Sequence, residues 1–418
     1  MSDPPAADNS TPPNPFSIST GPAAALLWGA FLGSSWTWVI GMIFPALLLR
    51  DYGIWGWVVF AVPNAIGAAA MGFVLRRPEA SRRITRNHHT ACHNFSVITV
   101  AYHLFVVAWL FTKLFGPLAT PLLLAAVALC AGFGLRNRNS AMLGVSVVVS
   151  LLSWGCFVLA VRGPGAWGLC TSCPPLQGVN RLTLDDLMFF LPCSVLGFLL
   201  CPYLDLTFHR ARSNTTPGTG MAAFAIGFLG VFLLMIVFSL SYGAQLLPLI
   251  EGQADAELPG FWQALLAIHL TAQAGFTITI HARETIEDPK ASTPWLMAAG
   301  GIAILLGFMA GMTQLPSHAA TGGLSWGEAG YRGFLLFYGT VFPAYVWLVM
   351  IPTRKPLSRW GRELRTGVYS ISCGLAYALA WVSFVMGHSR FILGIFALLI
   401  VARIAIELLP KEDDIWAD

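Results

Sequence analysis

The chain is short of charge. Only 11% of its 418 residues are charged and 56% are hydrophobic, whereas soluble domains carry roughly 25% charged residues. So few charged side chains cannot cover the surface of a water-soluble globule, and no segment has the composition of a soluble domain. The composition therefore predicts an all-α, polytopic membrane protein that contacts lipid and binds no nucleic acid.

Motifs for catalysis and for nucleotide binding are also missing. The sequence contains no nucleotide-binding glycine loop, no nucleophile elbow and no zinc-protease helix. This argues against ATP-driven transport by this chain alone, and we predict that the chain is not an enzyme and has no resident cofactor. The eight cysteines are scattered, except that Cys170 and Cys173 share a predicted outer loop, where an oxidising exterior favours a disulfide.

Long apolar runs dominate what remains. About 20 apolar residues cross the 30 Å core of a bilayer, and this length predicts about twelve transmembrane helices. They lie at 23–50, 53–75, 94–115, 117–135, 141–161, 184–208, 219–246, 259–282, 294–314, 330–352, 366–387 and 391–409.

The spans fall into three groups. Residues 23–352 are predicted to form a ten-helix core, built from a repeat at 23–161 and an inverted repeat at 184–352. Two additional helices follow at 353–409. Residues 1–22 and 410–418 are predicted to be tails, the first of them disordered because it is polar and rich in proline.

The basic residues predict an orientation. With a cytoplasmic N-terminus, sixteen Lys and Arg residues fall in inner loops and six in outer loops. Positive charge gathers on the cytoplasmic side of membrane proteins. We therefore expect a cell (inner) membrane protein with both termini in the cytoplasm.

Two spans carry residues that interrupt a helix. The first reads GSSWTWVIGMIFP over 33–45, and the sixth contains Pro192, Gly197 and Pro202. Non-helical backbone at bilayer depth is tolerated only where protein buries it or where it lines a cavity. Interruptions at matching places in two halves of opposite topology are typical of inverted-repeat transporters. Alternatively, the small residues let neighbouring helices pack closely.

The first two spans resemble a known family. The stretch SSWTWVIGMIFPALLLRDYGIWGWVVFAVPNAIGAAAMGFVLRR (34–77) is similar to the first core helices of the sodium:solute symporters. That family has a Ser-x-Thr-aromatic stretch, a Gly a few residues later, a Tyr-Gly pair, a second helix and then basic residues. The matching residues here are Ser35, Thr37, Trp38, Gly41, Tyr52, Gly53, Arg76 and Arg77. GFLLCPYLDLTFHRARSNT (197–215) is similar to the end of core helix six. The resemblance implies the leucine-transporter-like fold and ion-coupled transport.

The eighth span departs from that family. Sodium:solute symporters place two adjacent hydroxyls on core helix eight, a few residues before a Thr-x-Asp-x-Tyr stretch. Here Thr277, Thr279 and His281 match that stretch, so Gln273 and Ala274 stand at the hydroxyl positions. If span eight aligned with the family in another register, Thr271 or Thr277 would supply a hydroxyl oxygen to the ion. The coupling ion is therefore left open between Na⁺ and H⁺.

A solute site is expected between spans one and six. Aromatic side chains with one polar group each suit a small amphipathic solute. The predicted lining is Ser34, Ser35, Trp36, Thr37, Trp38, Gly197, Phe198, Tyr203 and Tyr338. The predicted ion-coupling residues are Gly33, Gly41, Thr271, Gln273, Thr277, His103 and His269.

The histidines admit other interpretations. His103 and His269 lie within spans, where they serve as proton relays, as structural hydrogen-bonding groups or as haem ligands. His89, Cys92 and His93 share a helix face and form a weak candidate metal site. Asp205 and His209 are spaced to pair with each other or to gate an inner exit.

These features predict a secondary active transporter that moves a small organic solute by alternating access around broken spans one and six. The first alternative is a non-transporting sensor or regulatory module on the same fold. The second is a membrane haem or redox protein. The sequence leaves the oligomeric state open.

Overall fold

The computed structural model describes residues 19–136, 139–168, 184–251, 258–287, 293–313 and 323–412. All the named elements in these ranges are helices, which confirms the predicted all-α class. The N-terminal tail up to residue 18, the Cys170–Cys173 pair and the tail from residue 413 lie outside the described residues.

Several spans consist of a single α-helix. Others contain a 3₁₀ turn (η1) or π-helical segments (η2, η4, η5 and η6) between α-helical parts. In chain order the elements are α1 (Gly21–Trp36), α2 (Val39–Tyr52), α3 (Ile54–Val74), α4 (Pro78–Asn87), α5 (His89–Phe115), α6 (Thr120–Arg136), α7 (Asn139–Ala160), α9 (Leu184–Leu200), η1 (Cys201–Leu204), α10 (Leu206–Ser213), α11 (Pro217–Ala225), η2 (Ile226–Phe232), α12 (Leu233–Glu251), α13 (Gly260–Ile286), α14 (Thr293–Met312), α15 (Trp326–Leu336), η4 (Phe337–Val341), α16 (Phe342–Tyr345), η5 (Val346–Met350), α17 (Arg359–Ala380), η6 (Trp381–Val385) and α18 (Phe391–Glu407).

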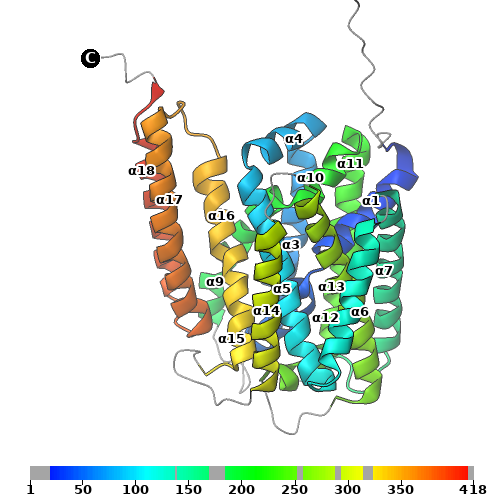
Figure 1. The fold of residues 1–418 in the computed structure, drawn as a ribbon. Coiled ribbons are helices and arrows are strands. Elements are labelled where there is room, and N and C mark those ends of the chain that lie inside the picture. Colours follow the sequence, from blue (N-terminus) through cyan, green and yellow to red (C-terminus); the bar gives the residue numbers. More distant parts are fainter. Residues whose placement is uncertain are drawn as a thin grey trace, which may run out of the picture.

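The helices form a bundle of roughly parallel and antiparallel spans (Figure 1). Within the described ranges, nine helices are long and apolar enough to cross a membrane, and α1 with α2 make a tenth. These confirm a polytopic membrane protein. The helices α6 and α18 are 17 residues each, and the predicted count of twelve requires both of them to cross.

The end of the bundle that carries α4 and α10 is called the inner end below, after the predicted orientation, and the opposite end is the outer end. The inner end is at the top of Figure 1.

Span one is broken, as predicted. The axes of α1 and α2 differ by 59°. Between them Thr37 and Trp38 leave the helical conformation, and Trp38 is extended at φ −78° and ψ 172°. The break lies just after the Gly-Ser-Ser stretch, and Pro45 is accommodated inside α2.

Span six is also interrupted, but nearer its inner end than Pro192 and Gly197 suggest. Both of those residues lie within α9, which runs to Leu200. One 3₁₀ turn follows, and then Asp205 is extended at φ −78° and ψ 110° before α10 begins. The Asp205 side chain accepts a hydrogen bond from the backbone N–H of Thr207, so it caps α10.

The packing of the spans repeats with an offset of five. Span one (α1) packs against span seven (α11 and η2), and span six (α9) packs against span two (α3). Span three (α5) packs against span nine (α14), and span eight (α13) packs against span four (α6). If each span is replaced by the span five positions away, the one–seven pair becomes the six–two pair, and the three–nine pair becomes the eight–four pair. The two inverted repeats stay a prediction, which this correspondence favours.

The last two helices pack against each other at one side of the bundle. Figure 1 shows α17 and α18, in orange and red, beside α16, and α18 also contacts η5. The helix α18 also contacts α9 of span six.

Candidate functional site

A small enclosed cavity lies beside the break in span one. Its volume is about 10 Å³, which is close to the space that one water molecule needs. The walls are Trp36, Trp38, Ile40 and Gly41 of span one, Asn64 of α3, Phe198 and Cys201 of span six, and Tyr338 of η4. Five predicted site residues therefore meet here: Trp36, Trp38, Gly41, Phe198 and Tyr338.

The aromatic walls are held in place by polar partners. The ring centroids of Trp36 and Trp38 are 4.4 Å apart, and those of Trp38 and Tyr338 are 5.1 Å apart. Trp36 Nε1 donates to Asn64 Oδ1 at 2.6 Å, and the Tyr338 hydroxyl lies 2.9 Å from Thr99 Oγ1. Since the polar atoms of Trp36 and Tyr338 are each bound to another helix, these two walls are preorganised.

The three predicted hydroxyl side chains satisfy groups around the break and do not line the cavity. Ser34 Oγ lies 2.9 Å from Ser150 Oγ on α7. Ser35 donates to the Leu32 carbonyl at 3.0 Å, and Thr37 donates to the Gly33 carbonyl at 2.7 Å. All three hydroxyls are therefore satisfied within the protein, which is what burial at bilayer depth requires of a polar group.

Gly33 serves a packing role as well. A Cβ added to it would lie 2.5 Å from Val231 Cγ1 on η2, so only glycine allows α1 to approach span seven this closely. Gly33 therefore lets two helices pack closely, and it also lies in the stretch just before the break.

The start of α2 is capped by a histidine. His103 Nδ1 lies 2.7 Å from the Thr99 carbonyl, which can only accept, so Nδ1 carries the proton. The unprotonated Nε2 then accepts the backbone N–H of Val39 at 3.3 Å. With both ring nitrogens engaged, His103 stabilises the break and offers no lone pair to a haem iron.

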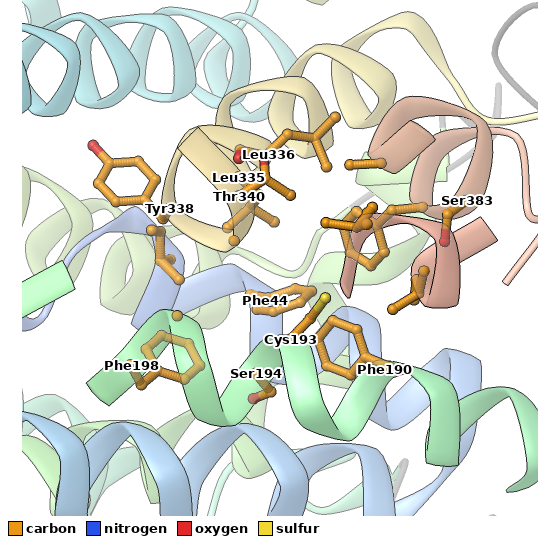
Figure 2. A pocket seen from close by; sticks show the side chains of 17 residues that line it. Phe44, Phe190, Cys193, Ser194, Phe198, Leu335, Leu336, Tyr338, Thr340 and Ser383 are labelled. Carbon is orange, nitrogen blue, oxygen red and sulfur yellow. Dashed lines mark hydrogen bonds between the residues drawn. The ribbon is translucent and has the colours of Figure 1, made fainter. Parts of the chain in front are cut away.

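A second, larger cavity adjoins the first. It has a volume of about 70 Å³ and is lined by residues of α2, α9, α15, η4, α17, η6 and α18. Figure 2 shows Phe44, Phe190, Cys193 and Phe198 on its walls. Gly197 lines this cavity but not the smaller one, and Tyr203, on η1, lines neither.

The larger cavity is apolar in character although hydroxyls line it. Ser194 donates to the Val59 carbonyl at 2.8 Å, and Thr340 donates to the Leu336 carbonyl. Because these hydroxyls are bound to backbone, the free surface is hydrocarbon and aromatic rings. Ile40, Phe198 and Tyr338 are walls of both cavities, so a shift of these side chains would join them.

The ion-coupling candidates on α13 form a separate polar cluster. Gln273 Nε2 donates to Ser153 Oγ at 2.8 Å, and His269 Nδ1 lies 3.0 Å from the same oxygen. Gln273 Oε1 and Thr277 Oγ1 are buried and without a hydrogen-bond partner in the described part of the chain. Thr271 lines a different groove, against α6 and α7.

The outer end is closed by a buried ionic network. Arg50 at the end of α2 bonds to Asp51 and to Glu328 of α15, both at 2.7 Å. Arg332 bonds to the same two carboxylates, and its guanidinium lies 4.7 Å above the Phe384 ring. The four charged side chains are at most 4% exposed. They balance in charge and connect span one to span ten, and Arg50 also bonds to the partly exposed Glu251 of α12 at 3.2 Å.

The inner end is open by comparison. A cleft of about 470 Å³ is lined by polar residues of α4, α5, α10 and α13, among them His89, His93, His209, Arg210, Glu284 and Glu287. Arg210 pairs with both glutamates across the cleft wall. Burial raises the pKa of Glu287, but hydrogen bonds from Arg283 and Arg210 outweigh it and lower the pKa.

The weak candidate metal site is not assembled. The rings of His89 and His93 lie 4.3 Å apart beside the cleft, whereas Cys92 is fully buried. In the ranges that the structure describes, no three His, Cys, Asp or Glu side chains are grouped to hold a metal ion. The suggested Asp205–His209 pair does not form either, because His209 bonds to Ser81 and to the Tyr203 carbonyl.

No family model and no curated protein matches this chain. The resemblance to sodium:solute symporters therefore stays an expectation.

Sequence reasoning missed several residues of the site. Asn64 and Thr99 hold the aromatic wall, and Asp51 and Glu328 complete the ionic network. A signal for the network was present in the sequence: Arg50 and Asp51 are adjacent at the end of predicted span one, and Glu328 and Arg332 are four residues apart at the start of predicted span ten. An ionisable residue within a span is rare unless it is paired or functional.

Proposed function

We propose that this protein is a secondary active transporter for a small amphipathic organic solute. The observation that carries the proposal is the meeting of the two breaks. Thr207, just after the break in span six, lies with its Oγ1 3.3 Å from Ser35 Oγ, just before the break in span one. The small cavity beside the break in span one, called the central cavity below, has walls from both spans.

The asymmetry between the two ends supports alternating access. A buried ionic network closes the outer end, and a polar cleft opens at the inner end. A transporter needs a state that is closed on one side and accessible from the other. The small cavity shares no lining residue with the inner cleft, so we infer that this conformation is occluded, with its outer end closed.

The cavities indicate the chemistry of the solute. The central cavity is too small for an organic molecule in this state, but it shares walls with the larger apolar cavity. Joined, the two would hold a solute whose apolar part lies among Phe44, Phe190 and Phe198. Its polar part would face Asn64 and the indole of Trp36.

A binding screen tests this proposal. Purified protein is tested for thermal stabilisation by a panel of small amphipathic solutes, with and without Na⁺. The matched pair of variants is Cys193→Leu, which fills the apolar cavity, and Cys130→Leu, the same change at an exposed position. We expect Cys193→Leu to weaken binding at least about tenfold, about 1.4 kcal/mol, while Cys130→Leu binds as the wild type.

If no solute stabilises the protein, or if Cys193→Leu binds as the wild type does, the proposed site is wrong. Binding without transport would favour the sensor or regulatory module instead.

A further inference from the structure

Asp205 is a buried carboxylate that is only half satisfied. Its Oδ1 accepts from the backbone N–H and the hydroxyl of Thr207 at 2.8 and 2.7 Å. Its Oδ2 has no hydrogen-bond partner among the described residues, and the side chain is 0% exposed. A polar atom left in this way costs about 1–3 kcal/mol, and more when it is charged.

The other unsatisfied atom at this place belongs to His281 of α13. Its Nε2 lies 4.0 Å from Asp205 Oδ2, is also buried, and has no hydrogen-bond partner in the described ranges. Its Nδ1 lies 3.1 Å from Ser96 Oγ. With the imidazole proton on Nδ1 and donated to Ser96, the lone pair of Nε2 faces the carboxylate.

No cation balances Asp205 among the side chains that the structure places around it. The titratable groups that face the pair are Cys92 and His103 of α5, Cys201 of η1, Glu284 of α13 and Tyr338 of η4. His103 is held neutral by its two hydrogen bonds, and Glu284 is bound to Arg210. From α4, Ser81 bonds to His209 and Arg82 to the Ser213 carbonyl. An ionised Asp205 would therefore be an uncompensated buried charge.

We propose that Asp205 and His281 together bind one proton and that this proton is the coupling ion, an inference that rests on the transport function proposed above. In the loaded state the proton joins Asp205 Oδ2 and is donated to His281 Nε2, and the pair is neutral overall. In the unloaded state the proton has left to water and Asp205 carries the negative charge. Closing the 4.0 Å gap to a hydrogen bond is the movement that loading requires.

The surroundings favour a proton over Na⁺. Na⁺ is a hard ion that needs several oxygen ligands, whereas the atom opposite Asp205 Oδ2 is an imidazole nitrogen. The pair also lies close to water, because Leu206, the next residue, and His209 line the polar inner cleft.

The pair contacts both breaks, which couples proton binding to the conformation. Asp205 is itself the break in span six, and its partner Thr207 contacts Ser35. The ring of His281 packs edge-on against Trp38, with centroids 5.6 Å apart, at the break in span one. Loading the pair therefore acts on both interrupted helices and on the wall of the central cavity.

Infrared difference spectroscopy tests the site with protons alone. Spectra of the purified protein are recorded between acidic and basic pH for the wild type, Asp205→Asn, His281→Gln and the control Asp186→Asn, which lies in α9 of the same span. We expect a titrating carboxyl C=O band that Asp205→Asn removes. His281→Gln should shift its titration midpoint, and Asp186→Asn should leave it unchanged.

Three results would overturn the inference: a wild type with no titrating buried carboxyl, an unchanged band in Asp205→Asn, or a band that Na⁺ removes at constant pH. If Asp205→Asn does not fold, the midpoint in His281→Gln decides, since an unchanged midpoint rejects the pair.

A transport measurement separates this inference from the proposed function. With a solute from the binding screen and an inward gradient of one pH unit, one proton per solute drives up to about tenfold accumulation. Asp205→Asn should lose accumulation and keep exchange of labelled solute. A wild type without exchange contradicts transport, while the infrared band still reports on the proton site. Equal accumulation by both proteins rejects the pair.

Discussion

At the scale of single residues, buried polar atoms decide what holds the centre of the molecule together. The Val39 N–H at the start of α2 has no partner in its own helix, because the chain is extended before it. His103 supplies the missing acceptor from α5. An intramembrane histidine thus serves as the cap of a broken helix, and its neutral form is required for that role.

Removing this cap should destabilise the protein. His103→Leu leaves the Val39 N–H unpaired in an apolar environment, and we expect a loss of about 1–3 kcal/mol. The thermal melting temperature in detergent should fall clearly below that of His388→Gln, an exposed histidine variant that serves as the control. Equal melting temperatures would show that Val39 needs no acceptor from His103.

The residue scale is also where prediction from sequence was least complete. Hydroxyls near a break were expected to line a solute site, but Ser34, Ser35 and Thr37 bond to helix backbone and to a neighbouring serine. Sequence gives the residue types near a break but not the direction of each side chain. Asp205 and His281 are 76 positions apart, so no local pattern could pair them.

At the scale of elements, the two interrupted spans are the feature that sequence predicted best. Small residues and prolines correctly indicated that span one is broken. Each break lies instead where a side chain satisfies the first N–H groups of the following helix: His103 accepts from Val39 in span one, and Asp205 caps α10 in span six. Pro192 remains inside α9, which fits the tolerance of transmembrane helices for proline.

The contact between the breaks can be tested with a crosslink. Ser35 Oγ and Thr207 Oγ1 are 3.3 Å apart, so we expect Ser35→Cys with Thr207→Cys to form a disulfide on oxidation. The bond should stop solute exchange, and a reductant should restore it. The control is Ser34→Cys with Thr207→Cys, because Ser34 faces Ser150 on α7.

Mass spectrometry of the oxidised protein gives the result directly. A crosslink in the control pair at the same rate would mean that the two breaks are not held in the observed contact. Full exchange by the crosslinked protein would mean that the breaks need not separate during transport.

At the scale of the whole molecule, the closed outer end depends on one ionic network of four buried charges and the partly exposed Glu251. Arg50 and Asp51 belong to span one, and Glu328 and Arg332 belong to span ten. Hydropathy predicted the spans because lipid imposes length and composition on each helix separately. It could not predict this network, because its partners are up to 281 positions apart.

Neutralising one member should open the outer end. Glu328→Gln leaves two buried guanidinium groups with one buried carboxylate, Asp51, and one partly exposed carboxylate, Glu251. Breaking such a network costs about 3–5 kcal/mol. We expect a lower melting temperature and faster labelling of Cys193 by a membrane-impermeant maleimide applied at the outer side. The control is Glu363→Gln, which removes an exposed ion pair with Arg359 and should change neither.

Unchanged labelling of Cys193 in Glu328→Gln, with the variant folded, would show that the ionic network does not keep the outer end closed.

The central claim is that spans one and six carry a solute across the membrane by moving at their breaks. Its most direct test is solute exchange by proteoliposomes that contain the Ser35→Cys, Thr207→Cys protein, measured with the binding solute before and after oxidation. The account predicts exchange in the reduced protein, none after oxidation, and recovery with reductant. Solute binding by the reduced protein without any exchange would contradict it.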